Sequence, residues 1–359
     1  MKAIVVTAPG EAGLVHDRPK PAIRDGYMLV KTQSIALNPT DWKHAALTQT
    51  PGILLGCDYA GVVEEVGANV TKPFAKGDRV MGFVHGGNSN EPEDGAFAEY
   101  IMVKGDIQAH VPDGMSFEEA ATFGVGITAV GQGLYQALGL PLPPAPDHYD
   151  QAVDETSPRG PRDPILIYGG STASGVLGLQ CTALSGFRPL ATCSPHNAEL
   201  VAGFGADEVY DYGDGEDAAE DIRAATGDGL RLCWDTVSTA WTVRFCAAAL
   251  SSRGGKLATL QPVRSPASGV LECVDTKAYA VFGEAWGMGA QQFPAMPGDW
   301  EFGKRWWSLA ERLIAHGKIR PHKIQVGPRG LEGALEGLAA LRDSKVSGYK
   351  LVYRVSETP

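Results

Sequence analysis

The feature that most constrains this chain is the stretch from Ile165 to Leu260, where short apolar runs alternate with helical patterns. Strands that alternate with helices at this spacing form βαβ units, in which each helix carries the chain back so that neighbouring strands run parallel. We therefore expect a doubly wound parallel sheet of the α/β class. Its expected strands are residues 165–168, 188–193, 208–210, 230–236 and 256–260, with 278–282 as one more candidate, and its expected helices are 174–184, 196–204, 218–226 and 239–250.

The strongest chemical signal is the turn at Gly169-Gly170, which follows the first of these strands. A helix begins within a few residues, so free backbone N–H groups and the positive helix end favour an anion at the same place. Ser171, Thr172 and Ser174 add hydroxyl donors. The glycine spacing differs from GxGxxG, so the context carries more weight than the pattern. The turn predicts a dinucleotide pyrophosphate site; the alternative is a plain tight turn between strand and helix.

The end of the second strand bears on which dinucleotide is bound. NAD enzymes place Asp or Glu about 20 residues after the glycines, to bind the ribose 2′-hydroxyl. Here residues 191–197 hold no carboxylate. Ser194 and His196 can donate to a 2′-phosphate that a carboxylate would repel, and Tyr212 is placed to add a hydroxyl. These residues favour NADPH over NADH, although the usual arginine is missing. Alternatively, Ser194 and Asn197 are ordinary helix caps.

The rest of the chain has other periodicities. The first third is predicted to be β-rich, with strands at 3–7, 27–36, 58–66, 79–83 and 97–103. Ser116-Phe-Glu-Glu119 is a capping box that predicts a helix start, and a second helical pattern covers 128–138. Residues 141–164 predict a long exposed loop rich in Pro, Asp and Ser. Residues 283–298 are expected to be irregular, 300–316 to form a helix, and 330–355 to form a helix and then a strand.

Length and composition narrow the class of protein. The 359 residues exceed one typical core and fit two domains. The net charge of −11 lacks the basic footprint of a nucleic-acid-binding protein. No apolar run is long enough to cross a membrane and no signal peptide is visible, so we expect a cytoplasmic protein. The six cysteines are scattered, with no pair at CxxC spacing, which predicts reduced thiols and no metal site.

Four motifs in the first hundred residues resemble the medium-chain dehydrogenase/reductase superfamily. They are Asn38-Pro-Thr-Asp-Trp-Lys43, Gly56-Cys-Asp-Tyr-Ala-Gly-Val-Val-Glu-Glu-Val-Gly67, Gly77-Asp-Arg-Val80 and Gly95-Ala-Phe-Ala-Glu-Tyr100. The resemblance implies a GroES-like β-rich catalytic domain, from residues 1–125 and 319–359, and a Rossmann NADPH-binding domain at 126–318. Zinc-dependent members carry Gly-His-Glu where this chain has Gly56-Cys57-Asp58, and Cys57 alone cannot hold zinc. The chain therefore resembles the zinc-free branch, which contains quinone and enoyl reductases.

Within that branch the chain resembles fungal trans-acting enoyl reductases, which serve polyketide synthases that lack a working reductase domain. The similarity lies in residues 138–143, 168–174, 191–197, 282–284 and 346–351. The resemblance implies that the residues that contact NADPH are Thr40, Asp41, Trp42, Lys43, Ser171, Thr172, Ala173, Ser174, Ser194, Pro195, His196, Asn197, Tyr212, Leu260, Gln261, Val346 and Ser347. It implies that the substrate pocket is lined by Gly124, Val125, Gly126, Ile127, Thr128, Ala129, Val130, Gly131, Ala280, Val281, Phe282, Gly283 and Glu284.

This chain departs from the family pattern at two places. A Leu-Pro pair is usual where it has Phe123-Gly124, and Asn is frequent where it has Gln261. The first departure affects the shape of the pocket and therefore the choice of acyl chain.

The resemblance also implies the reaction. Hydride passes from NADPH to the β-carbon of an enoyl thioester, the α-carbon takes a proton, and the thioester oxygen carries negative charge. Lys43 is the candidate for cofactor contact and Thr128 for thioester contact; alternatively, Lys43 is a solvated surface lysine and Thr128 a helix-terminal residue. We expect Asp41 to cap the turn at residues 38–43 rather than act as an acid, and Cys57 to lie in the core. No side chain is singled out as the proton donor, and water can serve.

The implied partners are a polyketide synthase or its acyl carrier protein and the enoyl thioester, with neither nucleic acid nor membrane. Carrier proteins are acidic, so docking needs a local basic patch, although each charge by itself is more simply a solvated one. Residues 283–300 stand where a family dimer pairs its strands, and their Gly, Pro and Trp content predicts a monomer. Candidate contributors to the patch are Arg244, Arg253, Lys256, Lys304 and Arg305.

Two other functions stay open from the sequence. One is a quinone or free enone reductase of the same zinc-free branch. The other is a non-catalytic protein that binds NADPH and assembles with a synthase.

Overall fold

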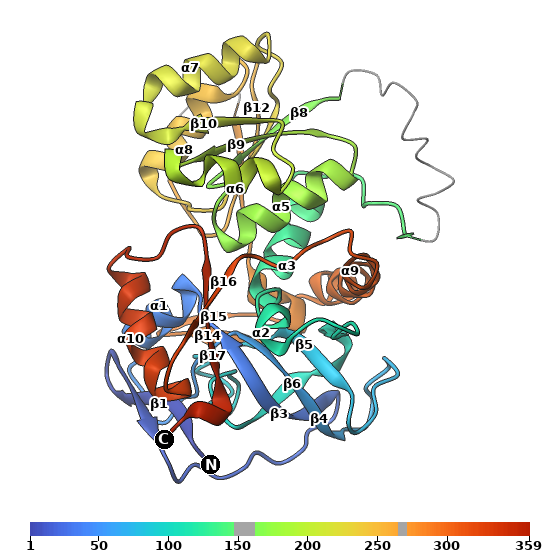
Figure 1. The fold of residues 1–359 in the computed structure, drawn as a ribbon, viewed down its shortest axis with the longest axis vertical. Helices are drawn as coiled ribbons and strands as arrows, with labels where there is room; N and C mark the ends of the chain where they lie inside the picture. Colours follow the sequence, from blue (N-terminus) through green and yellow to red (C-terminus); the bar gives the residue numbers. More distant parts are fainter. Residues whose placement is uncertain (147–161, 265–270) are drawn as a thin grey trace. The chain divides into compact units, whose positions relative to one another are not determined.

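The computed structural model describes residues 1–146, 162–264 and 271–359, which divide into two compact units (Figure 1). Unit 1 comprises Met1–Thr128, Tyr279–Glu311 and Pro321–Pro359, and unit 2 comprises Ala129–Ala278 and Arg312–Arg320. Most of the loop predicted at 141–164 lies outside the described residues. The domain boundaries at 125/126 and 318/319 stay a prediction, and Tyr279–Glu311 groups by its contacts with unit 1.

Unit 2 contains a parallel sheet with the strand order β10-β9-β8-β11-β12-β13. The chain starts in the middle at β8, moves outward to β10, and returns to the other side of β8. Because βαβ crossovers are right-handed, this reversal puts α5 and α6 on one face of the sheet and α7 and α8 on the other (Figure 1). The order is that of doubly wound dinucleotide-binding sheets, with the reversal point between β8 and β11. The elements are β8 (Pro164–Tyr168), α5 (Ala173–Leu184), β9 (Arg188–Cys193), α6 (Ala198–Gly203), β10 (Glu208–Asp211), α7 (Glu216–Ala225), β11 (Leu232–Asp235), α8 (Ala240–Ala249), β12 (Gly255–Thr259) and β13 (Leu271–Asp275).

The strand predicted at 278–282 is wrong. These residues form a 3₁₀ helix, η6 (Ala278–Phe282), whose residues from Tyr279 onward are buried. The sixth strand is β13, which pairs with β12 from Gly255↔Leu271 to Thr259↔Asp275. The apolar run at 278–282 reflects burial, and a short apolar run does not by itself distinguish a strand from a helix.

Unit 1 is built on a seven-stranded sheet with the path β16-β17-β3-β4-β5-β7, in which β6 also pairs with β3. Its longest pairing is antiparallel, β3 with β4, from Met28↔Val66 to Ala36↔Asp58. The strands of unit 1 are β1 (Ala3–Ala8), β2 (Glu11–Val15), β3 (Tyr27–Ala36), β4 (Asp58–Val66), β5 (Arg79–Phe83), β6 (Tyr100–Lys104), β7 (Gln108–His110), β14 (Trp286–Met288), β15 (Gln291–Phe293), β16 (Ile324–Gly327) and β17 (Lys350–Arg354). The β-rich character predicted for the first third of the chain is confirmed.

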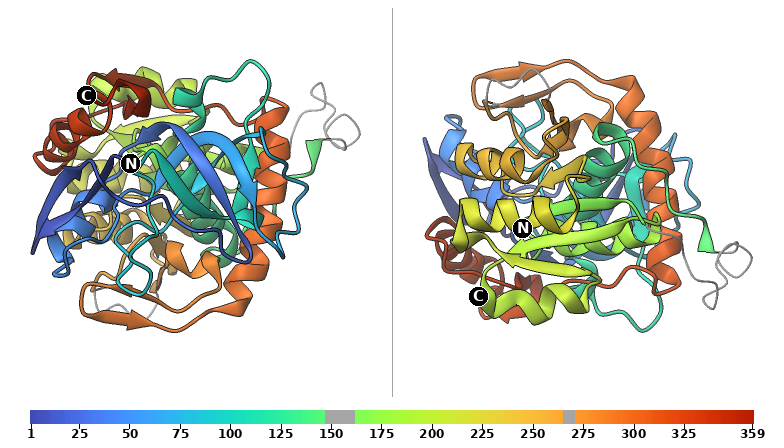
Figure 2. Two further views of the ribbon diagram at one scale, coloured as in Figure 1. Left: turned by 90° about the horizontal axis from the view of Figure 1, so that it is seen from below. Right: turned by 90° about the horizontal axis from the view of Figure 1, so that it is seen from above.

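Both ends of the chain contribute to unit 1. Strand β17 pairs with β3, so the last segment completes the sheet that the first hundred residues begin. Helix α10 contacts β1, β2, α1 and β17, and Figure 2 shows it in red beside the dark-blue N-terminal strands. Lys2 Nζ donates to the carbonyl oxygen of Thr358 at 2.7 Å. The remaining helices are α1 (Pro39–Leu47), α2 (Phe117–Ala120), α3 (Gly124–Val130), α9 (Pro297–Ala315) and α10 (Gly330–Arg342), and the division between the units falls within α3 and α9.

Three short segments of unit 1 differ from their predicted structure in part or in full. The capping box at Ser116 is confirmed, but its helix α2 lasts one turn before α3 begins. Residues 38–43, expected as a turn, begin helix α1, because Pro39 and Asp41 suit the first turn of a helix as well as a β-turn. Residues 283–298, expected to be irregular, contain the hairpin of β14 and β15. Among the described residues, no helix is long and apolar enough to cross a membrane.

Candidate functional site

The turn between β8 and α5 needs glycine at Gly169. Its φ is +79°, and a Cβ there would lie 2.6 Å from Thr236 Oγ1. Thr172 caps α5 by accepting a hydrogen bond from the Gly175 N–H at 2.9 Å, and its Oγ1 lies 2.9 Å from Thr236 Oγ1. Ala173 begins the helix, and Ser174 is buried within its first turn. A narrow glycine turn in front of a 12-residue helix, bordered by hydroxyls, is a cradle that suits a pyrophosphate.

The predicted 2′-phosphate residues come together from two strands. Ser194 follows β9, Tyr212 follows β10, and their hydroxyl oxygens lie 2.6 Å apart. Asn197 is buried and its Nδ2 donates to Ser171 Oγ at 3.4 Å, which links this region to the glycine turn. The residues beside them, Pro195 and His196, are exposed. No Asp or Glu stands at residues 191–197, at the end of β9, where NAD enzymes place a carboxylate.

Leu260 and Gln261 lie in the loop after β12 and bond to Ser238, which lies in the loop after β11. The Leu260 N–H donates to Ser238 Oγ at 2.8 Å, and Gln261 Nε2 donates to the Ser238 carbonyl at 2.9 Å. Ser238 is in turn fixed by Asp235, whose Oδ1 accepts the N–H groups of Val237 and Ser238, both at 2.9 Å. Burial raises the pKa of Asp235, and hydrogen bonds to the ionised form, led by that from Thr242, oppose the rise. The hydrogen bonds to Ser238 tie the loop after β12 to the loop after β11.

Sequence reasoning missed an exposed tryptophan at this edge. Trp241, in the first turn of α8, is 43% exposed. Its ring lies 6.4 Å from that of Tyr212 and 6.3 Å from that of Tyr168, both roughly edge-on. A large aromatic side chain at the start of a helix, directly after a strand of the parallel sheet, was the available signal. Such a ring next to the Ser194–Tyr212 pair is suited to stack on a planar base.

In unit 1, the predicted residues 40–43 lie on the first turns of α1. Asp41, expected to cap a turn, caps the start of α1 instead, because its Oδ2 accepts the Asn38 N–H at 2.7 Å. Burial raises the pKa of Asp41 to about 7. Trp42 packs against the core of unit 1, and Lys43 is half-buried, which lowers the pKa of its amine. Thr40 is partly exposed, and its Oγ1 lies 2.9 Å from the hydroxyl of Tyr279.

A buried ion pair holds the base of α1. Asp58 and Lys350 have side-chain exposures of 0% and 2%, and their charged groups are in contact. Asn38 bridges them, donating from Nδ2 to Asp58 Oδ2 at 2.9 Å and accepting from Lys350 Nζ at 3.0 Å. The second oxygen of Asp58 accepts the Val125 N–H at 2.6 Å. This network joins α1, β4, β17 and the start of α3.

The predicted pocket segment 124–131 begins beside the Asp58 carboxylate, which accepts the Val125 N–H. A Cβ on Gly124 would lie 2.2 Å from the carbonyl oxygen of Gly82, so the departure from the family's Leu-Pro is matched by a close approach of the backbone. Thr128 is buried; its hydroxyl donates to the Gly124 carbonyl at 3.1 Å and accepts from Trp307 Nε1 at 3.2 Å. Residues Gly126, Ile127, Ala129, Val130 and Gly131 are buried and Val125 is partly exposed. Thr128 thus lies inside α3 and not at a helix terminus, which is the alternative interpretation of the sequence, and its contact with the thioester stays a prediction.

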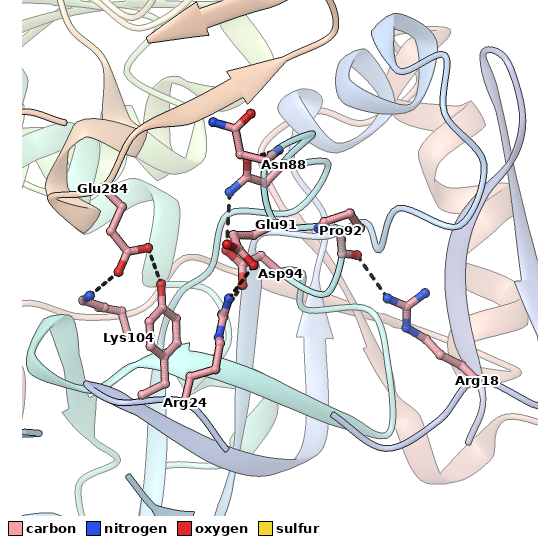
Figure 3. A network of polar contacts seen from close by, with 10 residues as sticks. Arg18, Arg24, Asn88, Glu91, Pro92, Asp94, Lys104 and Glu284 are labelled. Atoms are coloured by element: carbon pink, nitrogen blue, oxygen red, sulfur yellow. Dashed lines mark hydrogen bonds and ion pairs between the residues drawn. The ribbon is translucent and has the colours of Figure 1, made fainter. Parts of the chain in front are cut away.

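The second predicted pocket segment lies in and after η6. Ala280, Val281 and Phe282 are buried. Glu284 is held at its carboxylate by two residues of the sheet, an ion pair with Lys104 and a hydrogen bond from the Tyr27 hydroxyl at 2.6 Å (Figure 3). Gly283 between them has φ +69°. The last predicted cofactor residues, Val346 and Ser347, are partly buried and exposed respectively.

Figure 3 shows a second anchor beside Glu284. Arg24 forms ion pairs with Asp94 and Glu91, and Asn88 Nδ2 donates to Asp94 Oδ2 at 3.4 Å. Burial raises the pKa of Asp94 to about 6, against the lowering effect of Arg24. The loop 86–94 and residue Glu284 are thereby tied to the same end of β3.

Cys57 lies in the core, as predicted. It is fully buried, and burial raises the pKa of its thiol well above the usual value. Within the described part of the chain, no group of three or more His, Cys, Asp or Glu side chains is arranged to hold a metal ion.

Comparison with known proteins decides the family. The alcohol dehydrogenase GroES-like domain matches residues 24–113. The trans-enoyl reductase resD of Aspergillus sclerotiorum is 58% identical over 99% of this chain and 100% of its own length. The trans-enoyl reductase ACTTS2 of Alternaria alternata is 42% identical over 99% of this chain and 98% of its own length. The chain belongs to the trans-enoyl reductase family.

Solved structures agree on the fold of this trans-enoyl reductase family member. An alcohol dehydrogenase superfamily protein from Novosphingobium aromaticivorans superimposes with a TM-score of 0.77 at 21% identity, over 99% of both chains. The CurK enoyl reductase superimposes with a TM-score of 0.73 at 16% identity, over 98% of both chains. The protein therefore combines a GroES-like β-rich domain with a Rossmann domain, as in the medium-chain dehydrogenase/reductase superfamily. It is an oxidoreductase, and its superfamily implies a nicotinamide cofactor, which the glycine cradle and its hydroxyl donors fit.

Proposed function

We propose that this trans-enoyl reductase family member reduces the α,β double bond of an enoyl thioester on the acyl carrier protein of a polyketide synthase, with NADPH as the reductant. The observation that carries the choice of NADPH is the Ser194–Tyr212 hydroxyl pair, at 2.6 Å, across the ends of β9 and β10. Neutral hydroxyls can donate to a phosphate dianion, whereas the carboxylate of an NAD site would repel it.

Unit 2 supplies the proposed contacts with the phosphate and adenosine parts of NADPH. The turn at Gly169 and the N-terminus of α5 hold the pyrophosphate through backbone N–H groups. Ser194, Tyr212 and the exposed His196 donate to the 2′-phosphate, and Trp241 stacks on the adenine. Bound NADPH supplies the hydride for the β-carbon.

Unit 1 supplies the proposed contacts at the reacting end. Thr40 and Lys43 are partly exposed polar residues in the first turns of α1, and we propose that both contact the cofactor. Thr128 is the proposed contact with the thioester, and its hydroxyl is held by hydrogen bonds with the Gly124 carbonyl and Trp307 Nε1. Lys43 is half-buried, which lowers the pKa of its amine, and its proposed role is contact with the cofactor.

The test is an assay of purified protein with NADPH and enoyl thioesters of pantetheine. We expect NADPH consumption with these thioesters, much slower consumption with NADH, and little with quinones or free enones. Turnover of quinones or free enones with thioesters inert would instead make the protein a reductase of those compounds.

The carrier protein is tested separately. The same enoyl group is offered on pantetheine and on the carrier protein of a candidate synthase, and KM is compared. A lower KM for the carrier-bound form supports a trans-acting role, and an equal KM removes the carrier from the proposal.

We also propose that the protein is a monomer, and analytical ultracentrifugation of the protein alone checks this.

A further inference from the structure

Tyr279 is a buried tyrosine that the proposed function does not yet use. It is 8% exposed, and its hydroxyl lies 2.9 Å from Thr40 Oγ1 and 3.6 Å from Cys57 Sγ. Burial raises the pKa of Tyr279 well above its usual value, so the side chain is a neutral phenol with one hydrogen to donate. The Tyr279 hydroxyl is thus the buried partner of a partly exposed Thr40 hydroxyl.

The ring of Tyr279 is held in place by its neighbours. His85 stacks on it with the ring centres 3.9 Å apart and the planes 15° apart. Phe83 and Trp286 contact it at 5.4 Å and 5.3 Å between ring centres. His85 is itself buried, which lowers its pKa and keeps the imidazole neutral. A ring packed in this way cannot swing its hydroxyl away from Thr40 without disturbing the core.

The direction of the hydrogen bond follows from the partners that each hydroxyl has. A buried O–H that is not donated is costly, and the Tyr279 hydroxyl can donate to the Thr40 oxygen or to the Cys57 sulfur. The oxygen is the nearer and the stronger acceptor, because sulfur accepts only weakly. If Tyr279 donates to Thr40, the hydrogen of the partly exposed Thr40 hydroxyl is directed to a different acceptor.

We propose that Tyr279 is a positioning residue of this reductase, and that by donating to Thr40 it directs the Thr40 hydroxyl outward as a hydrogen-bond donor to an acceptor oxygen of the bound reactants. The inference rests on the proposed function and adds to it a residue and a direction. A ribose hydroxyl of the cofactor and the thioester carbonyl both offer such an oxygen. Without the bond from Tyr279, the orientation of the Thr40 hydroxyl is no longer fixed.

The experiment uses Tyr279→Phe, Thr40→Val and the double variant, with Tyr59→Phe as the matched control. Tyr59 is also fully buried in unit 1, and its hydroxyl donates to Gln108 Oε1 at 2.9 Å, far in sequence from the predicted site residues. We expect Tyr279→Phe and Thr40→Val each to lower kcat/KM about tenfold, the usual scale for one lost hydrogen bond. The double variant should lose no more than Thr40→Val, because Tyr279 acts only through Thr40. Tyr59→Phe should keep wild-type turnover. Thr40→Ser keeps a hydroxyl at position 40 and should keep most of the wild-type kcat/KM.

The kinetic constants identify the acceptor oxygen. A loss in the affinity for NADPH, measured by titration without thioester, assigns the oxygen to the cofactor. A loss confined to kcat and to KM for the thioester assigns it to the thioester carbonyl. Wild-type kinetics in Tyr279→Phe, or losses that multiply in the double variant, would overturn the inference. If Tyr279→Phe does not fold, wild-type turnover in Thr40→Val overturns it equally, and an inactive wild-type protein overturns the proposed function and this inference together.

Discussion

The two units bury their polar groups in different ways. In unit 1, a full ion pair between Asp58 and Lys350 is almost entirely buried, with Asn38 between them. At the carboxyl edge of the sheet in unit 2, the buried Asp235 has no cationic partner among the described residues and is held by hydrogen bonds, and two further contacts join neutral hydroxyls, Ser194 with Tyr212 and Thr172 with Thr236. A buried charge pair cannot exchange its partner without a large cost, so it fixes the packing. Partly exposed hydroxyls such as those of Ser194 and Tyr212 can exchange a protein partner for a ligand oxygen, so they suit binding.

The largest expected effect comes from breaking the ion pair. Lys350→Met should destabilise the protein by about 3–5 kcal/mol, because it leaves the Asp58 carboxylate buried without its cation. Urea unfolding of the wild type and the variant measures the difference. The control is Lys76→Met, which removes the lysine that pairs with Glu64. The Lys76 side chain is 75% exposed, so the variant should lose less than about 1 kcal/mol of unfolding free energy. Equal losses in the two variants would mean that the charge network is not what fixes unit 1.

The next effect concerns the hydroxyl pair. Ser194→Asp should weaken NADPH by about 10- to 100-fold more than NADH, because a carboxylate repels the 2′-phosphate and can accept from a 2′-hydroxyl. Fluorescence titration with both cofactors measures the ratio. Ser194→Ala, which removes the donor without adding charge, should shift the ratio in the same direction by less. Equal weakening of both cofactors would remove the 2′-phosphate assignment.

A smaller effect is expected at the aromatic edge. Trp241→Ala should weaken NADPH and NADH alike by about 2- to 10-fold, the scale of one aromatic stacking contact. Trp241→Phe keeps a ring and should lose less. The same titrations measure both variants. A loss specific to NADPH would place Trp241 beside the phosphate and not the base.

The smallest effect tests a partly exposed charge cluster of unit 1. Burial alone would raise the pKa of Glu311, but the hydrogen bond from His110 and the charge of Lys72 outweigh it and lower the pKa to about 2. The hydrogen bond to Glu311 raises the pKa of His110. The lowered carboxylate pKa contributes stability that is present above about pH 4.5 and is lost as the pH falls towards 2. The raised histidine pKa contributes stability that is present below about pH 6.5 and is lost as the pH rises through the raised value.

The His110→Gln variant measures this contribution. The stability difference between wild type and variant should be largest between about pH 4.5 and 6.5 and should shrink above it. We expect roughly half a kcal/mol, because the His110 side chain is 39% exposed and solvent screens the pair. Thermal unfolding across this pH range checks it, and a difference that grows towards pH 8 would contradict the sign.

The regular elements were largely readable from the sequence, and the errors have identifiable causes. β3, β4, β5 and β9 match their predicted bounds, because short and mostly apolar runs end at clear turn signals. β13 was missed because Leu271–Asp275 is a short strand at the edge of the sheet with two acidic residues in it. α1 was taken for a turn because Pro39 and Asp41 favour both structures, and only the continuation through Leu47 distinguishes them.

The residues of the candidate site also fall into those that local sequence patterns located and those that they did not. Local patterns located the glycine turn, the missing carboxylate after β9 and the cap at Asp41, because each depends on residues close together in the chain. Trp241 was not singled out although its place at the start of a helix was a local signal, and Tyr279 was not found because its contact with Thr40 comes from a distant segment. Tyr279 meets Thr40 across 239 positions of the sequence, and nothing local to either residue indicates the contact.

The sequence by itself determined the alternation of strands and helices, the switch between a β-rich region and a parallel sheet, and the chemistry offered at the end of each strand. These properties follow from local periodicity and from residue types. The tertiary structure decided which hydroxyls pair, which charges are buried and which aromatic rings stay exposed. Those outcomes depend on segments brought together by folding, as when β17 from the end of the chain carries Lys350 to Asp58 near its beginning.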